Sequence, residues 1–356
     1  MKNIYRYLVA VLLFGMISIP FDGAQAGNKD RSGQAGAPEL LINPWARSAG
    51  WGNVGVANIR GLEAQWLNVA GLAHTRKTEI LFNNTQWLKG SDISINSFGF
   101  AQRIGESSVL GVSVMSMGFG EIPVTTYGSP DGTGATFKPN YMNINVAYAK
   151  AFSSSIFGGF NMKIISQSIS DLSATGFAID AGIQYVTGEE ENIKFGITLK
   201  NIGPTMSYSG DGLSLRAYLD KKSDLQNTLE QRAEDFELPA SLSIGFGYDF
   251  LFSDRQRFTL AGTFQSNSFT QDIFIAGGEY SFKDYFMVRA GYAYEAHSTD
   301  EITNSERLVA PTGLNLGATI EIPINKETGS SFGIDYSYSD TDSFEGTHRI
   351  GVKLNF

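Results

Sequence analysis

From about residue 76 onward the chain divides into segments of roughly ten residues in which apolar and polar side chains alternate. In the final segment Ile350, Val352, Leu354 and Phe356 alternate with polar or small residues. A β-strand points successive side chains to opposite faces, so one face of this segment is wholly apolar. The same alternation recurs at 193–199, 242–250, 286–292, 314–322 and 332–338. Many such segments in one chain are typical of a transmembrane antiparallel β-barrel.

The number of segments and the lengths of their connections indicate the size of the barrel. Fourteen segments begin near Thr78, Asp92, Ser108, Tyr141, Ser155, Ala174, Asn192, Leu238, Gln256, Gln271, Tyr285, Leu308, Ser331 and Thr347. Tight turns are expected at 105–106, 153–154, 188–190, 253–254 and 283–284, and long loops at 120–140 and 201–237. An even strand number with short periplasmic turns and longer external loops is usual in bacterial barrels, and it places both termini in the periplasm. The sequence therefore predicts an all-β fold, a barrel of about 14 strands over residues 76–356.

A soluble β-sandwich would show the same alternation, with the apolar face as its core. Charged residues, however, recur opposite the apolar face in many segments. This recurrence favours a barrel with a polar lumen.

The first 26 residues have the features of a secretory signal peptide. Lys2 and Arg6 precede an apolar stretch from Leu8 to Ile19 that is too short to span a bilayer, and Ala-Gln-Ala at 24–26 is a cleavage site. The chain has a formal net charge of −9 and no cysteine. The acidity argues against a nucleic-acid partner, and the lack of cysteine excludes disulfides and a lipoprotein anchor. We therefore expect export and an outer-membrane location.

Residues 27–75 do not follow the alternating pattern. They are rich in Gly and Ala, contain a short apolar run at 40–42 and carry isolated tryptophans. The segment is too polar to face lipid and too rich in large apolar side chains for a linker. We expect it to fold into the barrel lumen as a plug. Its candidate residues are Asn43, Trp45, Arg47 and Asn68.

Residues 38–48, Pro-Glu-Leu-Leu-Ile-Asn-Pro-Trp-Ala-Arg-Ser, resemble the first segment of the PorV/PorQ family, which are outer-membrane barrels of the type IX secretion system. Further similarities follow in order at 61–64, 67–73, 87–92, 236–239 and 332–338, so the resemblance covers essentially the whole mature chain. Residues 68–72, Asn-Val-Ala-Gly-Leu, also resemble the Asn-Pro-Ala-Gly-Leu element of FadL-type fatty-acid transporters. Val69 stands where that family usually has proline.

The resemblance implies a fourteen-stranded FadL-like barrel with an N-terminal plug. In the PorV branch, which the first segment favours, the barrel associates with the translocon barrel. It binds the C-terminal signal domain of secreted cargo and passes the cargo to a cell-surface attachment complex, to which the PorQ branch belongs. The implied partners are these proteins, the secreted cargo and outer-membrane lipid. A FadL-type transporter of hydrophobic compounds and a surface enzyme acting on lipid are the alternatives.

The two long loops carry apolar and aromatic residues in water-facing positions. The candidates for cargo or partner binding are Ile122, Tyr127, Phe137, Tyr141, Tyr208, Leu213 and Tyr218. Exposed groups of this kind mark either a binding surface or a lid that packs on itself, and the sequence leaves both open.

Charged residues on the polar face of the segments indicate what the lumen contains. They are Lys163, Asp180, Lys194, Lys200, Asp249, Glu279, Arg289, Glu321 and Lys353. An unpaired charge in a packed lumen is costly, so we expect them to pair with one another or with the plug. A hydrophobic substrate channel is the alternative.

Catalytic groups are sparse. His74, His297 and His348 have no metal-ligand spacing, and no serine lies in a Gly-x-Ser-x-Gly motif. A surface site of His297 or His348 with Ser298 or Asp342 would serve an enzyme, but unrelated loop residues explain them more simply. We expect no catalytic site, no metal and no cofactor.

Overall fold

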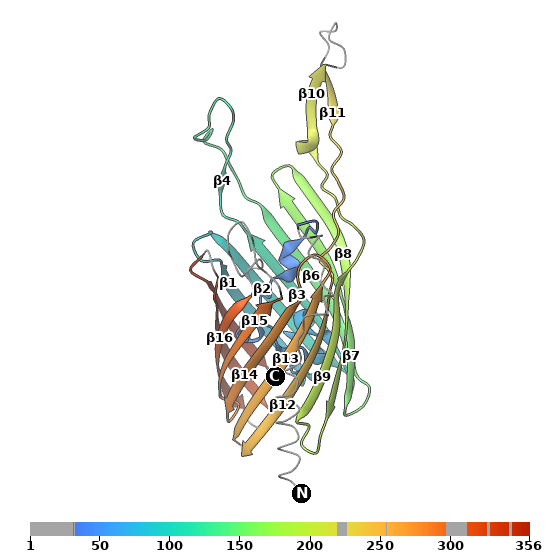
Figure 1. The fold of residues 1–356 in the computed structure, drawn as a ribbon, viewed down its shortest axis with the longest axis vertical. Coiled ribbons are helices and arrows are strands. Elements are labelled where there is room, and N and C mark those ends of the chain that lie inside the picture. The colour runs from blue at the N-terminus through green and yellow to red at the C-terminus, as the bar shows by residue number, and fades with distance from the viewer. Residues whose placement is uncertain are drawn as a thin grey trace.

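The computed structural model describes residues 31, 33–218, 226–253, 255–296, 312–325, 328–341 and 344–356. Within them, strands adjacent along the chain pair into one closed antiparallel barrel (Figure 1). Its fourteen strands are β1 (Thr78–Trp87), β2 (Ile93–Ile104), β3 (Ser108–Gly118), β6 (Asn140–Ala151), β7 (Ile156–Ile169), β8 (Leu172–Thr187), β9 (Ile193–Ile202), β12 (Ser241–Ser253), β13 (Gln256–Asn267), β14 (Ile273–Phe282), β15 (Phe286–Glu295), β16 (Gly313–Asn325), β17 (Ser330–Ser339) and β18 (Thr347–Asn355). The predicted fold class is confirmed. The predicted signal peptide, residues 1–26, lies outside the described residues.

The barrel closes where the first strand meets the last. β1 pairs with β18 from Glu79 opposite Asn355 to Gln86 opposite His348. Closure leaves no free sheet edge, so each strand finds backbone hydrogen-bond partners on both sides, as the hydrocarbon core of a bilayer requires.

The two ends of the barrel differ in their connections. One end, here called the turn end, carries the short turns 105–107, 152–155, 188–192 and 283–285. The other, the loop end, carries the long connections 119–139 and 203–240. These short turns and the two long loops lie where the sequence predicts them, but the loop end also carries the short connections 88–92 and 170–171.

Twelve of the strands begin within two residues of the predicted positions, and two do not. β16 begins at Gly313 instead of Leu308, which lies outside the described residues, and β12 begins at Ser241 instead of Leu238. The sequence predicts the start of this strand at the apolar Leu238. In the structure it is buried in a cluster with Ala37 and Leu40 from the N-terminal segment, and Pro239 follows it. Leu238 is therefore apolar because it packs inside the loop end of the barrel, and not because it faces lipid.

Two hairpins project from the loop end, well apart from each other (Figure 1). One pairs β4 (Ile122–Pro123) with β5 (Thr136–Phe137), and the other pairs β10 (Ser214–Tyr218) with β11 (Gln226–Glu230). The sequence did not predict these strands, since two to five residues are too few to show a period of two.

The outer wall is apolar because the strands alternate. On β16, Leu314, Leu316 and Ile322 point outward and are 43%, 43% and 55% exposed, whereas Asn315 between them is buried. The register of β16 shifts next to Pro323, which has no backbone N–H to donate to the neighbouring strand.

Residues 33–75, here called the lumen segment, fold into short helical turns inside the barrel. They are η2 (Pro38–Leu41), α2 (Ala46–Ala49), η3 (Gly55–Ala57), α3 (Ala64–Leu67) and η4 (Val69–His74). Arg31 forms an ion pair of 2.6 Å with Glu237 at the loop end, and Ala35 bridges the same residue. From there the segment crosses the lumen and joins β1 at the turn end. None of the described helices is long and apolar enough to span a membrane.

Candidate functional site

Asn68 fastens the lumen segment to the barrel wall. Its side-chain amide donates to the backbone carbonyls of Val56, at 2.9 Å, and Ile183 on β8, at 3.2 Å. Its side-chain oxygen accepts from the N–H of Ala70 and so caps η4. Gly182 makes this approach possible, because a Cβ there would lie 2.1 Å from the Asn68 oxygen.

Asn43 and Trp45 lie in the first third of the lumen segment. The Asn43 amide donates to Ser48 Oγ at 2.9 Å and to Asn53 Oδ1 at 2.6 Å. The backbone carbonyl of Asn43 accepts from Arg349 Nε on β18 at 3.1 Å. Trp45 is 2% exposed. Both residues therefore hold the segment in place and face no solvent.

Arg47, on α2, points toward the turn end. Its guanidinium lies 3.5 Å from the Glu321 carboxylate of β16 and donates to the sulfur of Met287. Nearby, Glu63 accepts from the backbone N–H of Ser48 at 2.8 Å. Of the predicted residues, Asn43, Arg47 and Asn68 thus bond to the wall, and Trp45 packs in a buried cluster with other residues of the segment and with Leu81 of β1.

The inward-facing charges are paired. Ion pairs join Lys163 to Asp180 at 2.8 Å, Lys194 to Asp249 at 2.5 Å, Arg289 to Glu279 at 2.8 Å, and Lys353 to Glu79 at 3.2 Å. The Lys200 ammonium lies 3.5 Å from the ring centre of Trp66 in the lumen segment. The predicted pairing of these charges with one another and with the segment is confirmed.

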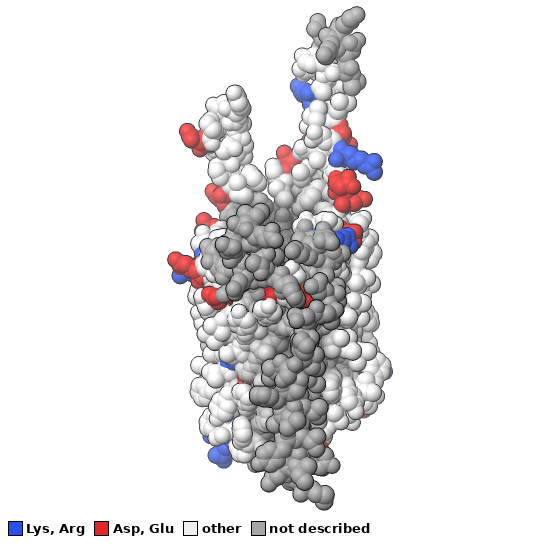
Figure 2. Space-filling view, viewed as in Figure 1, with Lys and Arg blue, Asp and Glu red and all other residues white. Residues whose placement is uncertain are grey.

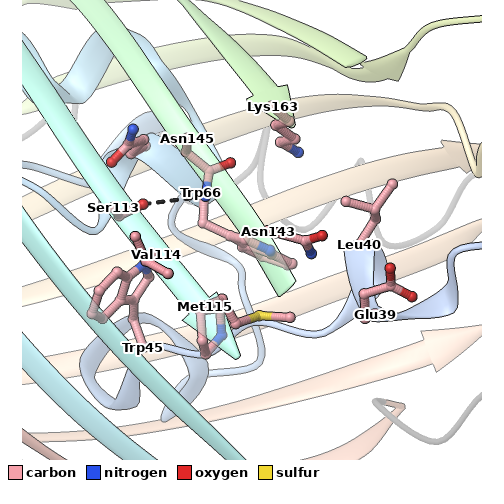
Figure 3. A pocket seen from close by; sticks show the side chains of 12 residues that line it. Glu39, Leu40, Trp45, Trp66, Ser113, Val114, Met115, Asn143, Asn145 and Lys163 are labelled. Atoms are coloured by element: carbon pink, nitrogen blue, oxygen red, sulfur yellow. Dashed lines mark hydrogen bonds between the residues drawn. The ribbon is translucent and has the colours of Figure 1, made fainter. Parts of the chain in front are cut away.

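Figure 3 shows a small cavity on the loop-end side of the lumen segment, of about 20 Å³. Glu39, Trp45 and Trp66 face Asn143 and Lys163 of the wall across it. Its volume suits about one water molecule. The cavity is therefore too small for a substrate.

Glu39 is the buried acid beside this cavity. Gln167 Nε2 on β7 donates to both carboxylate oxygens at 3.0 Å. Burial raises the pKa of Glu39, and the hydrogen bond from Gln167 opposes that rise. Gln167 also accepts from the Tyr208 hydroxyl at 2.6 Å, so one amide joins the lumen segment to a loop residue.

A second cavity, of about 520 Å³, opens on the turn-end side of the lumen segment. Charged side chains from both segment and wall line it, including Arg47, Arg60, Glu79, Asp249, Arg257, Glu279, Glu321 and Lys353. His74 also lines it and packs at a tilt against Phe157, with ring centres 4.1 Å apart. Burial lowers the pKa of His74 to about 3, and the charges of Arg60 and Lys194 lower it further. This cavity suits water and ions better than a hydrophobic compound.

Three of the predicted loop residues are exposed on the projecting hairpins. Tyr127 is fully exposed near the tip of the β4–β5 hairpin, where Ile122 is 37% exposed. Tyr218 is 58% exposed on the other hairpin, and the Gln226 side chain donates to its hydroxyl at 2.9 Å. Phe137 and Leu213 are half-buried at the bases of the two projections.

Tyr141 and Tyr208 turn inward, so for these two residues the structure favours the self-packed lid among the two alternatives that the sequence leaves open. Tyr141 packs edge-on against Phe119, with ring centres 4.8 Å apart, beside the buried cluster at the mouth. Tyr208 packs against Phe236, and burial raises the pKa of its hydroxyl. Both side chains turn inward because the mouth offers apolar contacts and, for Tyr208, a hydrogen-bond acceptor. They belong to a self-packed lid, and the two hairpins carry separate exposed groups.

Acidic residues outnumber basic ones in the long connections. The described parts of 119–139 and 203–240 contain seven acids (Glu121, Asp131, Asp211, Glu230, Glu234, Asp235, Glu237) and three bases (Lys138, Arg216, Arg232). Figure 2 shows acidic side chains along both projections. The loop end therefore has the potential to attract a basic surface.

Of the residues considered for a surface enzyme site, the structure describes His348 alone. His348 Nδ1 is 2.8 Å from the Tyr336 hydroxyl on the outer wall. His74 lies inside the barrel, in η4. His297, Ser298 and Asp342 lie outside the described residues. Among the residues that the structure describes, no group of three or more His, Asp or Glu is arranged to hold a metal ion.

Several residues of the wall that hold the lumen segment could not be predicted from the sequence. Arg103 on β2 donates to the backbone carbonyls of Ala73, Thr75 and Arg76, at 2.5–3.0 Å, where the segment leaves the lumen. Gln184 on β8 donates to the carbonyls of Val56 and Ile59. In the sequence, each of these residues shows only as a polar side chain on the inward face of a strand. That position does not identify the group to which the side chain bonds.

Solved structures share this fold at low sequence identity. They include the CymD monoaromatic hydrocarbon channel (TM-score 0.53, 14% identity, covering 89% of this chain and 98% of that one). The Ralstonia pickettii toluene transporter TbuX has a TM-score of 0.53 and 13% identity, covering 88% of this chain and 97% of its own. A Pseudomonas aeruginosa FadL homologue has a TM-score of 0.50 and 13% identity, covering 86% and 96%. At these identities the likeness establishes a FadL-like fold.

A search of curated proteins gave no significant match. The family model "Type IX secretion system protein PorV" matches residues 25–218, more than half of the chain. The family and the fold are those of outer-membrane secretion and transport proteins. The chain belongs to the PorV family of the type IX secretion system.

Proposed function

We propose that this protein receives secreted cargo at the loop end and passes it from the translocon barrel to the cell-surface attachment complex. In this proposal the loop end faces the cell exterior, the turn end faces the periplasm, and the lumen segment is a plug. The cargo element that is bound is its C-terminal signal domain. The observation that carries the proposal is the contrast between a filled, charged lumen and exposed apolar groups on the hairpins.

The filled and charged lumen favours a protein-binding role over the conduction of hydrophobic compounds. The lumen segment is fastened to the wall at Asn68, and the 520 Å³ cavity beneath it is lined by ion pairs. A hydrophobic compound entering this cavity would have to displace water from charged groups, which costs free energy. The family's secretion role agrees with a closed barrel.

The hairpins supply the binding surface. Tyr127 and Tyr218 are exposed on two separate projections, and aromatic groups are the usual anchors of protein interfaces. Two projections separated by a gap suit a folded domain that sits between them. The acidic residues along both would select a domain with a basic surface.

Replacing the exposed tyrosines tests the proposal. The double variant Tyr127→Ser, Tyr218→Ser should fold normally, because neither side chain packs in the barrel. Cargo with a C-terminal signal domain should then accumulate in the periplasm at least fivefold. The measurement is quantitative immunoblotting of periplasmic and cell-surface fractions.

Phe152→Ser with Phe252→Ser is the matched control, because both phenylalanines are 67% exposed at the turn end. This control should leave secretion unchanged. Normal secretion in the tyrosine variant, together with a fall in toluene uptake, would move the protein to the FadL-type transporter class.

A further inference from the structure

The cavity of about 520 Å³ at the turn end carries a surplus of positive charge, although the chain as a whole is acidic. Its lining contains six cationic side chains and five carboxylates. Each of the five carboxylates lies within 3.5 Å of one of four cations, which are Arg47, Lys194, Arg257 and Lys353. All the carboxylates of the cavity are therefore already engaged.

Two cations of the lining, Arg60 and Arg76, are left over. Arg60 lies in the lumen segment, and Arg76 follows directly after that segment. Within the ranges that the structure describes, neither guanidinium forms an ion pair or donates to a side chain. Asp249 is the carboxylate that acts most strongly on Arg60, and both its oxygens are occupied, by Lys194 at 2.5 Å and by the Thr259 hydroxyl at 2.7 Å. The fold thus supplies no acceptor for these two groups.

Arg60 is exposed, but to the cavity. Its neighbours in the chain, Ile59 and Gly61, are both buried inside the barrel. Burial lowers the pKa of Arg60, and the charge of Asp249 opposes that fall. A guanidinium on the outer surface would keep its full hydration, so the space that Arg60 reaches is the cavity.

The positions of the two arginines indicate the shape of a ligand. Arg60 faces Asp249 on β12 and Arg257 on β13. Arg76 lies beside the turn between β16 and β17, where a Cβ on Gly329 would be 2.7 Å from its guanidinium. Two cations at different places around one cavity suit a ligand with more than one anionic group. The volume lies in the range of small-molecule sites, about 300–1,000 Å³.

The chemistry of the lining separates the ligands that the cavity could take. A cation would find every carboxylate already paired, and a hydrophobic compound would strip water from the ion pairs. The strand residues of the lining face inward, so a phospholipid head group would have to leave the bilayer to reach them. Guanidinium groups match the paired oxygens of carboxylates and phosphates.

We infer that the turn-end cavity is a binding site for a small soluble polyanion with carboxylate or phosphate groups, held by Arg60 and Arg76. The ligand enters from the turn end and supplies the acceptors that the fold lacks. It also joins the lumen segment to the wall, because Arg60 belongs to the segment and the facing residues belong to the barrel. The site lies at the opposite end from the hairpins, and its occupation does not depend on the proposed binding of cargo.

Calorimetric titration of the purified full-length barrel in detergent tests the inference. Citrate and pyrophosphate are the probes, and they distinguish a carboxylate ligand from a phosphate ligand. At least one of them should bind with one ligand per barrel, and added salt should weaken the binding. Sorbitol, a neutral polyol, should give no heat of binding.

Variants assign the binding to the two arginines. Arg60→Gln with Arg76→Gln should fold, because neither guanidinium is in an ion pair, and should bind the anion at least tenfold more weakly. Arg60→Lys with Arg76→Lys keeps the charge but loses the planar fork, so its affinity should lie between those of the native and glutamine proteins. Arg216→Gln with Arg232→Gln is the matched control, because both arginines are exposed at the loop end, and it should bind as the native barrel does.

Arg76→Gln alone is a second measure, which does not alter the lumen segment, and it should weaken binding at least threefold. The inference is overturned if neither anion binds saturably, if the glutamine variants bind as tightly as the native barrel, or if the loop-end control loses as much affinity as they do. Binding of sorbitol as tight as that of the anions would also overturn it, since the site would then not select charge.

Discussion

The side chain of Asn68 donates to the backbone carbonyl of Ile183 at 3.2 Å, across the place where Gly182 lacks a side chain. This contact joins residues that are 115 positions apart in the chain. A side chain at position 182 would occupy the space that Asn68 needs. The lumen segment and the wall are therefore fitted to each other at this point.

The first prediction concerns this fit. Gly182→Val should displace Asn68, and Asn68→Ala should remove its hydrogen bonds at a cost of about 1–3 kcal/mol for the buried groups left unpaired. Both variants should admit a large antibiotic such as vancomycin, measured as a lower inhibitory concentration. Gly262→Ala is the control, since a Cβ there meets nothing closer than 3.9 Å. Unchanged exclusion of the antibiotic by Gly182→Val would show that this contact does not hold the segment.

The second prediction concerns pH. Burial lowers the pKa of His74 to about 3, below its value of 6.5 when unfolded, so the neutral form is favoured in the fold. The stability it supports is present above pH 6.5 and is lost as the pH falls toward 3, by at most about 1.4 kcal/mol per pH unit. His74→Gln should therefore flatten the decline in unfolding free energy between pH 6.5 and 4. Urea unfolding in detergent measures this slope, and an equally steep decline in the variant would contradict the assignment.

The third prediction tests the lipid face. Ile334 points outward from β17 and is 45% exposed, while the next residue, Asp335, is buried in the lumen. Ile334→Arg should destabilise the folded barrel in lipid by about 2–4 kcal/mol if the residue lies near the bilayer midplane. Ile334→Val is the control and should be nearly neutral. Folding titrations into vesicles give both values, and equal stability would place Ile334 outside the bilayer.

The fourth prediction concerns the seam. The Phe356 N–H donates to the Thr78 carbonyl at 2.9 Å, and its carbonyl accepts from Thr78 at 3.4 Å. Deleting Phe356 removes both bonds from the pair of strands that closes the barrel. The fraction of heat-modifiable, folded protein in the outer membrane should fall. Phe356→Leu keeps the backbone bonds and should fold better than the deletion, and equal yields would mean that the seam does not depend on them.

The fifth prediction tests orientation. Gly132 lies in the connection between β4 and β5, and Glu190 lies in the short turn between β8 and β9 at the opposite end. A protease site inserted at Gly132 should be cut on intact cells, whereas one at Glu190 should be cut only after the outer membrane is opened. Reversed accessibility would invert the proposed orientation.

The barrel could be predicted because successive side chains of a strand face lipid and lumen in turn, so apolar and polar residues alternate along the sequence. Ile350 and Val352 face out and Arg349 faces in, and the sequence shows this directly. The pairing of Glu39 with Gln167 could not be predicted, because its partners are 128 residues apart and neither lies in a motif. Nor could the inward turn of Tyr208, since a loop has no periodicity from which to infer the direction of a side chain.

The path of the N-terminal segment has a consequence for biogenesis. Arg31 lies at the loop end, and the chain passes through the whole lumen before β1 starts at the turn end. The seam joins the first barrel strand to the last, so it cannot form until the C-terminal strand has arrived. The lumen segment therefore reaches its final place by one of two routes: it lies against the open sheet before β1 pairs with β18, or it threads lengthwise through the closed ring.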